Sequence, residues 1–311
     1  MSSGSASLQE TRVSVTKLKG SGNAQIDVDV TSVVEDLEVI TTADSEGPDP
    51  TPISTEKYEE LVHYFKYASS SYALICPRPC GNKLVSTFSN AVTDIQGFVA
   101  RDEKRKELVV ALRGSASIAD IILDANIILV PALAPGIKAP SGARVHAGFL
   151  TAWNSVALQV LTIVQTQLKR HPEIEGVVTT GHSLGGAVAL LGALSLVGKV
   201  DESVKVRTYS YGSPRAGNRV FADHIQELFG ERAHRVVNSN DGVPTMIPRR
   251  LGYHHHGVEY WQNGKPMCGD TTLQCDPDGE DPKCSASIPS KGVNMAHTRY
   301  FGILVTTPFC L

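Results

Sequence analysis

The chain has 311 residues, of which 41% are hydrophobic and 20% are charged, as in a folded globular protein. This length allows one large domain or two ordinary ones, and the composition excludes a wholly disordered chain, a collagen-like fibre and a coiled coil. The net charge of −3 and the lack of a long basic run predict no nucleic-acid partner.

Neither a membrane span nor a secretory signal is predicted. We find no apolar stretch of the roughly 20 residues that a membrane-spanning helix needs, so we expect no stable membrane insertion. Met1 is followed by small polar residues rather than by a charged start and an apolar run. A mature secreted chain has also lost its signal, so this feature does not indicate a cytosolic protein.

The first 50 residues differ in composition from the rest, since they contain no aromatic residue and no cysteine. Alternating valines and isoleucines flank a turn at residues 20–23, which is typical of a hairpin. A proline-rich linker follows at residues 45–52. We therefore expect residues 1–50 to be an extension or pro-segment, or alternatively a disordered tail, and residues 51–311 to form the folded domain.

The next segments alternate between helical and strand patterns. Ser54 or Thr55 can cap a helix that ends near residue 70. The predicted elements after it are strands over 93–100 and 107–112, a helix over 151–170, a strand over 176–180, a helix over 187–197, a strand over 204–211, a helix over 221–229 and a strand over 235–238. This alternation predicts an α/β fold with a mostly parallel sheet.

A glycine-rich motif with a central serine, Gly181-His182-Ser183-Leu184-Gly185-Gly186, connects one of these strands to the next helix. It has the G-x-S-x-G form, in which a sharp turn presents the serine at the carboxyl edge of the sheet. The N–H of Leu184, at the start of the helix, is then directed at an oxyanion. An incidental serine in a glycine-rich turn is the alternative, and the strand and helix around the motif disfavour it.

A serine nucleophile needs a base and an acid, and in this architecture they follow it in the order acid, then histidine. Asp241 comes directly after the strand at 235–238, where a triad acid belongs, although an aspartate before glycine also suits an Asx-turn. We predict His297, near the end of the chain, as the base. Ser115, in a loop after the strand at 107–112, is the candidate second oxyanion donor, unless that loop is a plain strand-end turn.

Histidines and cysteines could instead indicate a metal site. Three consecutive histidines occupy 254–256, but adjacent side chains on an extended chain point apart, so we expect no metal and a structural role for one of them near the acid loop. The spacing of the cysteines does not fit zinc either. The even number of six, which allows 15 pairings, favours disulfides in an oxidising compartment over free buried thiols.

Seven stretches together resemble the fungal class 3 lipases, whose relatives include feruloyl esterases. They are residues 113–115, 145–149, 180–186, 211–218, 240–244, 253–261 and 297–302. The resemblance covers about residues 54–311. It implies an α/β-hydrolase fold with Ser183 as nucleophile, Asp241 as acid, His297 as base, and Ser115 and Leu184 as the oxyanion hole, with no cofactor.

The resemblance also implies disulfides and a lid. It suggests the pairs Cys76–Cys310 and Cys268–Cys275, which leaves Cys80–Cys284. A short helical lid would follow Ser115, and Ile118, Ile121 and Ile122 fall on one helical face of it. Such a face can cover the serine in water or open onto lipid, although it also suits an ordinary core helix.

These features together predict a secreted, extracellular, monomeric ester hydrolase that acts on acylglycerols at an oil–water interface through an acyl-enzyme. A feruloyl-type esterase with the same triad is the nearest alternative, since residues 292–294 and the cysteine-containing tail resemble that branch whereas the apolar lid does not. A non-catalytic lipid-binding module is a more distant one, which the complete triad disfavours.

Overall fold

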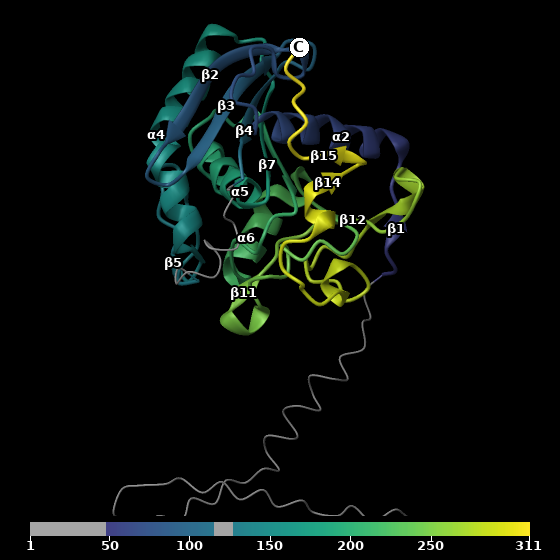
Figure 1. The fold of residues 1–311 in the computed structure, drawn as a ribbon. Coiled ribbons are helices and arrows are strands. Elements are labelled where there is room, and N and C mark those ends of the chain that lie inside the picture. Colours follow the sequence, from purple (N-terminus) through teal and green to yellow (C-terminus); the bar gives the residue numbers. More distant parts are fainter. Residues whose placement is uncertain (1–47, 115–126) are drawn as a thin grey trace, which may run out of the picture. The chain divides into compact units, whose positions relative to one another are not determined.

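The computed structural model describes residues 48–114 and 127–311, and Ser115, Ile118, Ile121, Ile122 and the first 47 residues lie outside them. The described part is built on a nine-stranded sheet with the order β1-β13-β12-β10-β8-β7-β4-β3-β2 (Figure 1). The strands are β1 (Thr51–Pro52), β2 (Lys83–Asn90), β3 (Ile95–Asp102), β4 (Glu107–Leu112), β7 (Gly176–His182), β8 (Lys205–Tyr211), β10 (Ala233–Asn238), β12 (Glu259–Gln262) and β13 (Thr272–Gln274).

The centre of this sheet is parallel and its edges are antiparallel. Strands β4, β7, β8, β10 and β12 pair in parallel, whereas β2 and β3 on one side and β13 and β1 on the other pair antiparallel. The predicted α/β fold with a mostly parallel sheet is therefore confirmed. The carboxyl ends of the parallel strands meet at one edge, which is where ligand sites form in such sheets.

Within the described ranges, helices cover the two faces of the sheet: α2 (Thr55–Ser70), α4 (Ala147–Arg170), α5 (Leu184–Val197) and α6 (Arg219–Phe229). Figure 1 shows α2 on one side and α4 and α5 on the other. The side chains of β4 alternate between these layers, with Val109 and Ala111 packing with α2 and Leu108 and Val110 packing with α4 and α5. Both faces of β4 are therefore buried, which explains why its residues after Glu107 are all apolar.

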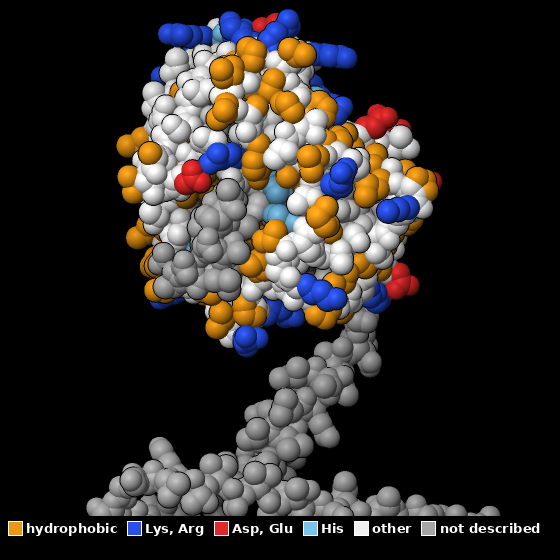
Figure 2. Space-filling view, in the orientation of Figure 1, with side chains coloured by type: hydrophobic (Ala, Val, Ile, Leu, Met, Phe, Trp, Pro, Cys, Tyr) orange, Lys and Arg blue, Asp and Glu red, His pale blue; other side chains and the backbone are white. Residues whose placement is uncertain are grey.

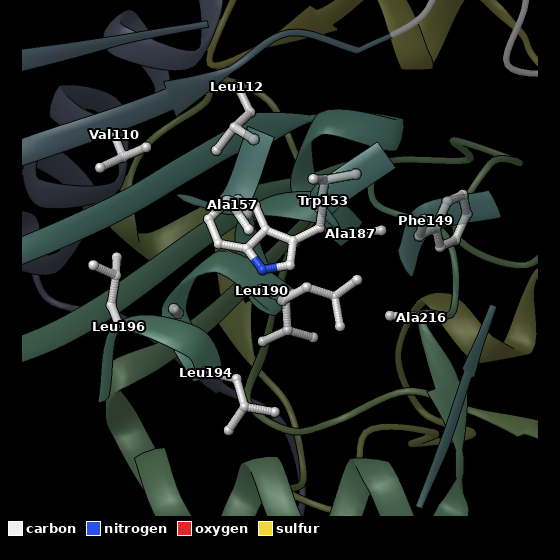
Figure 3. Close-up of a cluster of buried hydrophobic side chains, with 14 of the residues drawn as sticks. Val110, Leu112, Phe149, Trp153, Ala157, Ala187, Leu190, Leu194, Leu196 and Ala216 are labelled. Atoms are coloured by element: carbon white, nitrogen blue, oxygen red, sulfur yellow. The ribbon is translucent and has the colours of Figure 1, made fainter. Parts of the chain in front are cut away.

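The expectation that no segment is long and apolar enough to span a membrane is wrong for helix α4. It is long and apolar enough to meet the length and composition of a membrane-crossing segment, yet half of its apolar window is buried within the protein. Trp153 lies at the centre of the core cluster between α4 and α5, and its indole N–H donates to Ser195 Oγ over 2.7 Å (Figure 3). This packing accounts for the buried apolar residues of α4.

Side chains that cap the first turn determine where helices α2 and α4 begin. Ser54 accepts a hydrogen bond from the N–H of Lys57, which confirms its predicted capping role on α2. Helix α4 begins four residues before the predicted position because His146 Nδ1 accepts from the N–H groups of Gly148 and Phe149. Histidine is not among the usual capping residues, so the sequence pattern does not reveal this start.

Short strands complete the described fold. A four-stranded sheet has the order β11-β9-β6-β5, and β14 pairs with β15. These strands are β5 (Leu129–Pro131), β6 (Arg144–His146), β9 (Gly217–Asn218), β11 (Tyr253–His254), β14 (Arg299–Tyr300) and β15 (Ile303–Leu304). Short 3-10 turns include η1 (Pro79–Gly81), η2 (Gly230–Arg232), η3 (Arg249–Leu251), η4 (Gly269–Thr271), η5 (Ser285–Ser287) and η6 (Met295–Thr298).

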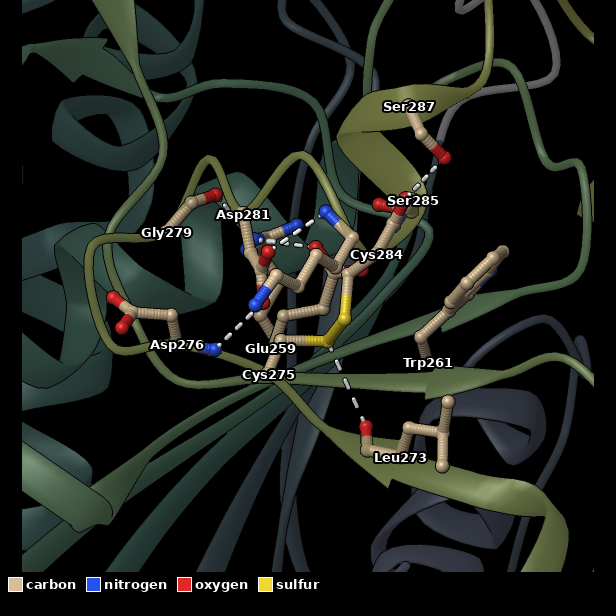
Figure 4. Close-up of a disulfide and its surroundings, with 12 residues drawn as sticks. Glu259, Trp261, Leu273, Cys275, Asp276, Gly279, Asp281, Cys284, Ser285 and Ser287 are labelled. Carbon is tan, nitrogen blue, oxygen red and sulfur yellow. Dashed lines mark hydrogen bonds and ion pairs between the residues drawn. A yellow bond between two sulfur atoms is a disulfide. The ribbon is translucent and has the colours of Figure 1, made fainter. Parts of the chain in front are cut away.

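Two disulfides are present among the described residues. Cys76 pairs with Cys310 as predicted and ties the segment after α2 to the end of the chain. The second bond joins Cys275 to Cys284, where the loop after β13 folds back beside Trp261 (Figure 4).

The predicted pairs Cys268–Cys275 and Cys80–Cys284 are therefore wrong. The extended strand β13 and turn η4 lie between Cys268 and Cys275, and Cys268 Sγ contacts Thr271 Oγ1 instead. Cys80 lies in η1, where its N–H donates to Phe309 O near the chain end. Both Cys80 and Cys268 are free thiols.

Candidate active site

Ser183 occupies a sharp turn between β7 and α5. Its φ of 60° and ψ of −133° are rare for a residue with a side chain. A Cβ at Gly181 would lie 2.2 Å from Gly185 O, and one at Gly185 would lie 2.4 Å from Leu112 O. Only glycine allows the strand and helix to approach this closely, so the glycines of the motif are what hold the serine at the sheet edge.

The backbone around Ser183 fixes its position. The Ser183 N–H donates to Tyr211 O over 2.8 Å, and Ser183 O accepts from the N–H of Gly186 over 2.9 Å. Leu184 is the first residue of α5, so its N–H has no acceptor within the helix. Leu184 directly follows Ser183 in the chain, and its role as an oxyanion donor stays a prediction from the sequence motif.

The structure brings Ser183, His297 and Asp241 together, although they lie on separate parts of the chain. Ser183 Oγ is 3.0 Å from His297 Nε2, and His297 Nδ1 is 2.9 Å from Asp241 Oδ2 and 3.1 Å from Oδ1. A carboxylate only accepts, so Nδ1 carries the ring proton and Nε2 is free to accept from the serine hydroxyl. All three residues are at most 5% exposed.

The carboxylate of Asp241 is held by two further donors. Its Oδ1 accepts from the N–H of Val243 over 3.0 Å, and its Oδ2 accepts from the hydroxyl of Tyr300 over 2.5 Å. Burial, and then the charge of Asp241, raise the pKa of the Tyr300 phenol well above its ordinary value, so it remains a donor. We did not predict this role for Tyr300, because nothing in the local sequence indicates that its hydroxyl reaches a loop 59 residues away.

Two asparagines hold the turn that carries His297. Asn294 Oδ1 accepts from the N–H groups of Ala296 and His297, and its Nδ2 donates to Asn240 O over 2.6 Å in the acid loop. Asn238 Nδ2, at the end of β10, donates to Ala296 O and Arg299 O. We predicted neither residue from the sequence. The only local signal was an asparagine before a short helical turn, which suits a cap.

The three consecutive histidines do not converge. His254 Nε2 is 3.1 Å from Asp278 O, His255 Nε2 is 2.8 Å from Pro244 O, and His256 Nδ1 is 2.5 Å from Gly257 O. His255 thus supports the acid loop through Pro244, the structural role that we predicted for one of the three. Burial lowers the pKa of His255 well below its ordinary value.

Two other groups of potential metal ligands occur within the described ranges. One contains Cys275 and Cys284, which are joined in a disulfide. The other comprises His63, Asp102 and Glu107. Both of its carboxylates already have protein donors: Tyr64 and Arg207 for Glu107, and Tyr67, Asn82 and the Arg105 N–H for Asp102. Neither group adjoins Ser183 in the contacts described.

The other predicted site residues, Ser115 and the three lid isoleucines, lie outside the described residues. Gly114, which precedes Ser115, lies against the nucleophile, since a Cβ on it would be 3.0 Å from Ser183 Cβ. Figure 2 shows histidine atoms at the bottom of a small depression with hydrophobic side chains around it. An ester that reaches Ser183 would meet its hydroxyl with the imidazole of His297 behind it and the buried carboxylate of Asp241 on the opposite ring nitrogen.

Comparisons with known proteins agree with this arrangement. A family model described as Lipase (class 3) matches residues 109–251. The "Lipase" of Rhizomucor miehei is 33% identical over 263 residues, which cover 80% of this chain and 70% of that protein. The "Secreted mono- and diacylglycerol lipase 1" of Fusarium solani is 33% identical over 240 residues, covering 71% and 68%.

Solved structures give the same result. One of them, "A serine protease triad forms the catalytic centre of a triacylglycerol lipase", has a TM-score of 0.73 and 31% identity, and covers 84% of this chain and 100% of that one. Another, "Rhizomucor miehei lipase propeptide complex, native", has a TM-score of 0.72 and 31% identity, and covers 85% and 86%.

Proposed function

This chain belongs to the class 3 lipase family and has the α/β-hydrolase fold, and from that premise we infer that it hydrolyses the carboxylic ester bonds of acylglycerols. The observation that carries the proposal is the contact of Ser183 Oγ with His297 Nε2 at 3.0 Å, with Asp241 on the opposite ring nitrogen. The similarity to a triacylglycerol lipase whose catalytic centre is described as a serine protease triad supports the same assignment.

The geometry supports a two-step reaction. His297 Nε2 takes the proton of Ser183 as Oγ attacks the ester carbonyl, and Asp241 stabilises the imidazolium that forms. The N–H groups of Leu184 and Ser115 stabilise the oxyanion. The alcohol leaves with the proton from His297, and a water molecule, activated by the same nitrogen, then releases the fatty acid from the acyl-enzyme.

We favour acylglycerols at an oil–water interface over feruloyl esters as substrates. The predicted lid face of Ile118, Ile121 and Ile122 is apolar, and the Fusarium relative is named for mono- and diacylglycerols. Large apolar side chains are also exposed: Met295, two residues before His297, by 74%, and Leu74 and Ile75, which follow α2, by 97% and 81%. Exposed apolar surface of this kind suits contact with lipid.

A substrate panel tests this proposal. The wild type should hydrolyse an emulsified long-chain triglyceride faster than methyl ferulate, and its rate on a short glyceride should rise abruptly above the solubility limit. Ser183→Ala should abolish both activities. A preference for methyl ferulate would contradict the choice of substrate, and full activity of Ser183→Ala would contradict the serine mechanism.

We also propose that the protein is secreted, acts as a monomer without a cofactor and carries a pro-segment at residues 1–50. The name of the secreted relative and the disulfides support secretion. The similar propeptide complex supports the pro-segment. The mass of the protein recovered from the culture medium tests this, because processing near residue 50 would remove that segment, whereas an intact chain would contradict it.

A further inference from the structure

A second histidine, His182, lies directly against the triad but has no part in the reaction just described. It ends β7, immediately before Ser183, and it is buried. Its ring centroid lies 4.4 Å from that of His297 and 5.9 Å from that of Tyr72. It therefore bridges the catalytic base and the segment that follows α2.

The hydrogen bonds of His182 fix its tautomer. Its Nε2 is 2.9 Å from the backbone oxygen of His297, and since a carbonyl only accepts, Nε2 carries the proton. Its Nδ1 is therefore an acceptor, and the Tyr72 hydroxyl, 2.8 Å away, donates to it. Burial, and then the proximity of His297, lower the pKa of His182 well below its ordinary value, which keeps it neutral while His297 takes up a proton.

The Tyr72 hydroxyl also lies against the oxyanion side of the site. A Cβ at Gly114 would be 2.4 Å from Tyr72 Oη and 2.7 Å from His182 O. Gly114 directly precedes Ser115, the proposed second oxyanion donor. The Tyr72 hydroxyl thus packs against Gly114, just after β4. Through His182 it also holds the backbone of His297.

We propose that Tyr72 and His182 are positioning residues for ester hydrolysis. The hydrogen bonds from Tyr72 Oη to His182 Nδ1 and from His182 Nε2 to His297 O fix the position of His297 relative to Gly114 and the end of β4. This inference rests on the proposed function. The hydrogen bond from His182 reaches the backbone oxygen of His297 and leaves both ring nitrogens of His297 to Ser183 and Asp241, so the pair acts on the placement of the imidazole rather than on the proton itself. Misplacement of a reacting group by about 1 Å can cost roughly 100-fold in rate.

The test compares Tyr72→Phe, His182→Gln and the double variant on a soluble nitrophenyl ester. Each single variant should lower kcat by about 10- to 100-fold with KM nearly unchanged. Because Tyr72 acts through His182, the double variant should lose no more than His182→Gln alone. Tyr58→Phe is the matched control on the same α2 region, since its hydroxyl donates to Met267 O over 2.9 Å, and its kcat should not change.

The melting temperature of each variant separates positioning from loss of fold. If Tyr72→Phe melts like the wild type yet loses activity, the positioning role is supported. If Tyr72→Phe and His182→Gln are both folded and within twofold of the wild-type kcat, the inference is overturned. An active wild type with an inactive Ser183→Ala would still leave the proposed function standing in that case.

Discussion

Gly212 lies where the acid, the base and Tyr300 come closest together. Its φ of +59° is in the left-handed region that favours glycine. A Cβ on it would lie 2.6 Å from Asp241 Oδ2, 2.7 Å from Tyr300 Oη and 2.9 Å from His297 Nδ1. One methyl group at this position would therefore separate the carboxylate from the imidazole.

We predict that Gly212→Ala lowers kcat on a soluble ester by at least about 100-fold, because the added methyl displaces the base from the acid. Gly230→Ala is the matched control. Gly230 also has a positive φ, of +52°, but nothing lies within 4 Å of its added Cβ. The control should lose some stability and keep its kcat, whereas near-normal kcat in Gly212→Ala would show that the acid–base contact is not needed.

The sequence could predict the three side chains of the triad but not their supports. Ser183 and Asp241 each follow a strand with a recognisable local pattern, and the order of acid and histidine is constrained by the fold. The bonds of Tyr300 and Asn238 join residues 59 and 61 positions apart, and no local pattern encodes such contacts.

At the scale of elements, the long strands and helices could be predicted because each carries its own periodicity. Strand β10 and helix α6 lie close to their predicted ranges. Strands β9, β11 and β14 have two residues each, so they owe their existence to pairing with distant partners. The pairing of Cys275 with Cys284 was missed for a similar reason, since the return of that loop is a tertiary feature.

The two disulfides should differ in their contribution to stability. The bond between Cys76 and Cys310 spans 234 residues, and that between Cys275 and Cys284 spans 9. By loop entropy alone, their removal costs about 5 and about 3 kcal/mol of unfolding free energy, respectively. We therefore expect the double alanine variant at Cys76 and Cys310 to unfold at a lower urea concentration than the double alanine variant at Cys275 and Cys284. Equal midpoints would contradict the entropic argument.

At the scale of the whole molecule, the fold buries histidines in their neutral form. Burial lowers the pKa of His146 and of His256 to about 4 and that of His234 to about 3. The ordinary value of about 6.5 applies in the unfolded chain, so between roughly pH 4 and 6.5 the unfolded chain binds more protons than the folded one. The contribution of these neutral histidines to the free energy of unfolding is thus fully present above pH 6.5 and is lost as the pH falls toward 4.

We predict that the urea midpoint falls steadily from pH 7 to pH 4. His234→Phe should show a shallower fall, because the replacement keeps the ring stacked on Tyr209, at 4.3 Å between centroids, and removes one of the titrating groups. Unfolding at pH 7, 6, 5 and 4 in both proteins measures this. A midpoint that is constant or rises toward acid would contradict the neutral burial of these histidines.

The central claim is that Ser183 is a nucleophile activated by His297, and covalent labelling tests it most directly. Diethyl 4-nitrophenyl phosphate should add one diethylphosphoryl group to the wild type, which peptide mass spectrometry should locate on Ser183. The same label should be absent from His297→Ala under the same conditions. A label on another residue, or equal labelling of Ser183 without the histidine, would contradict the mechanism.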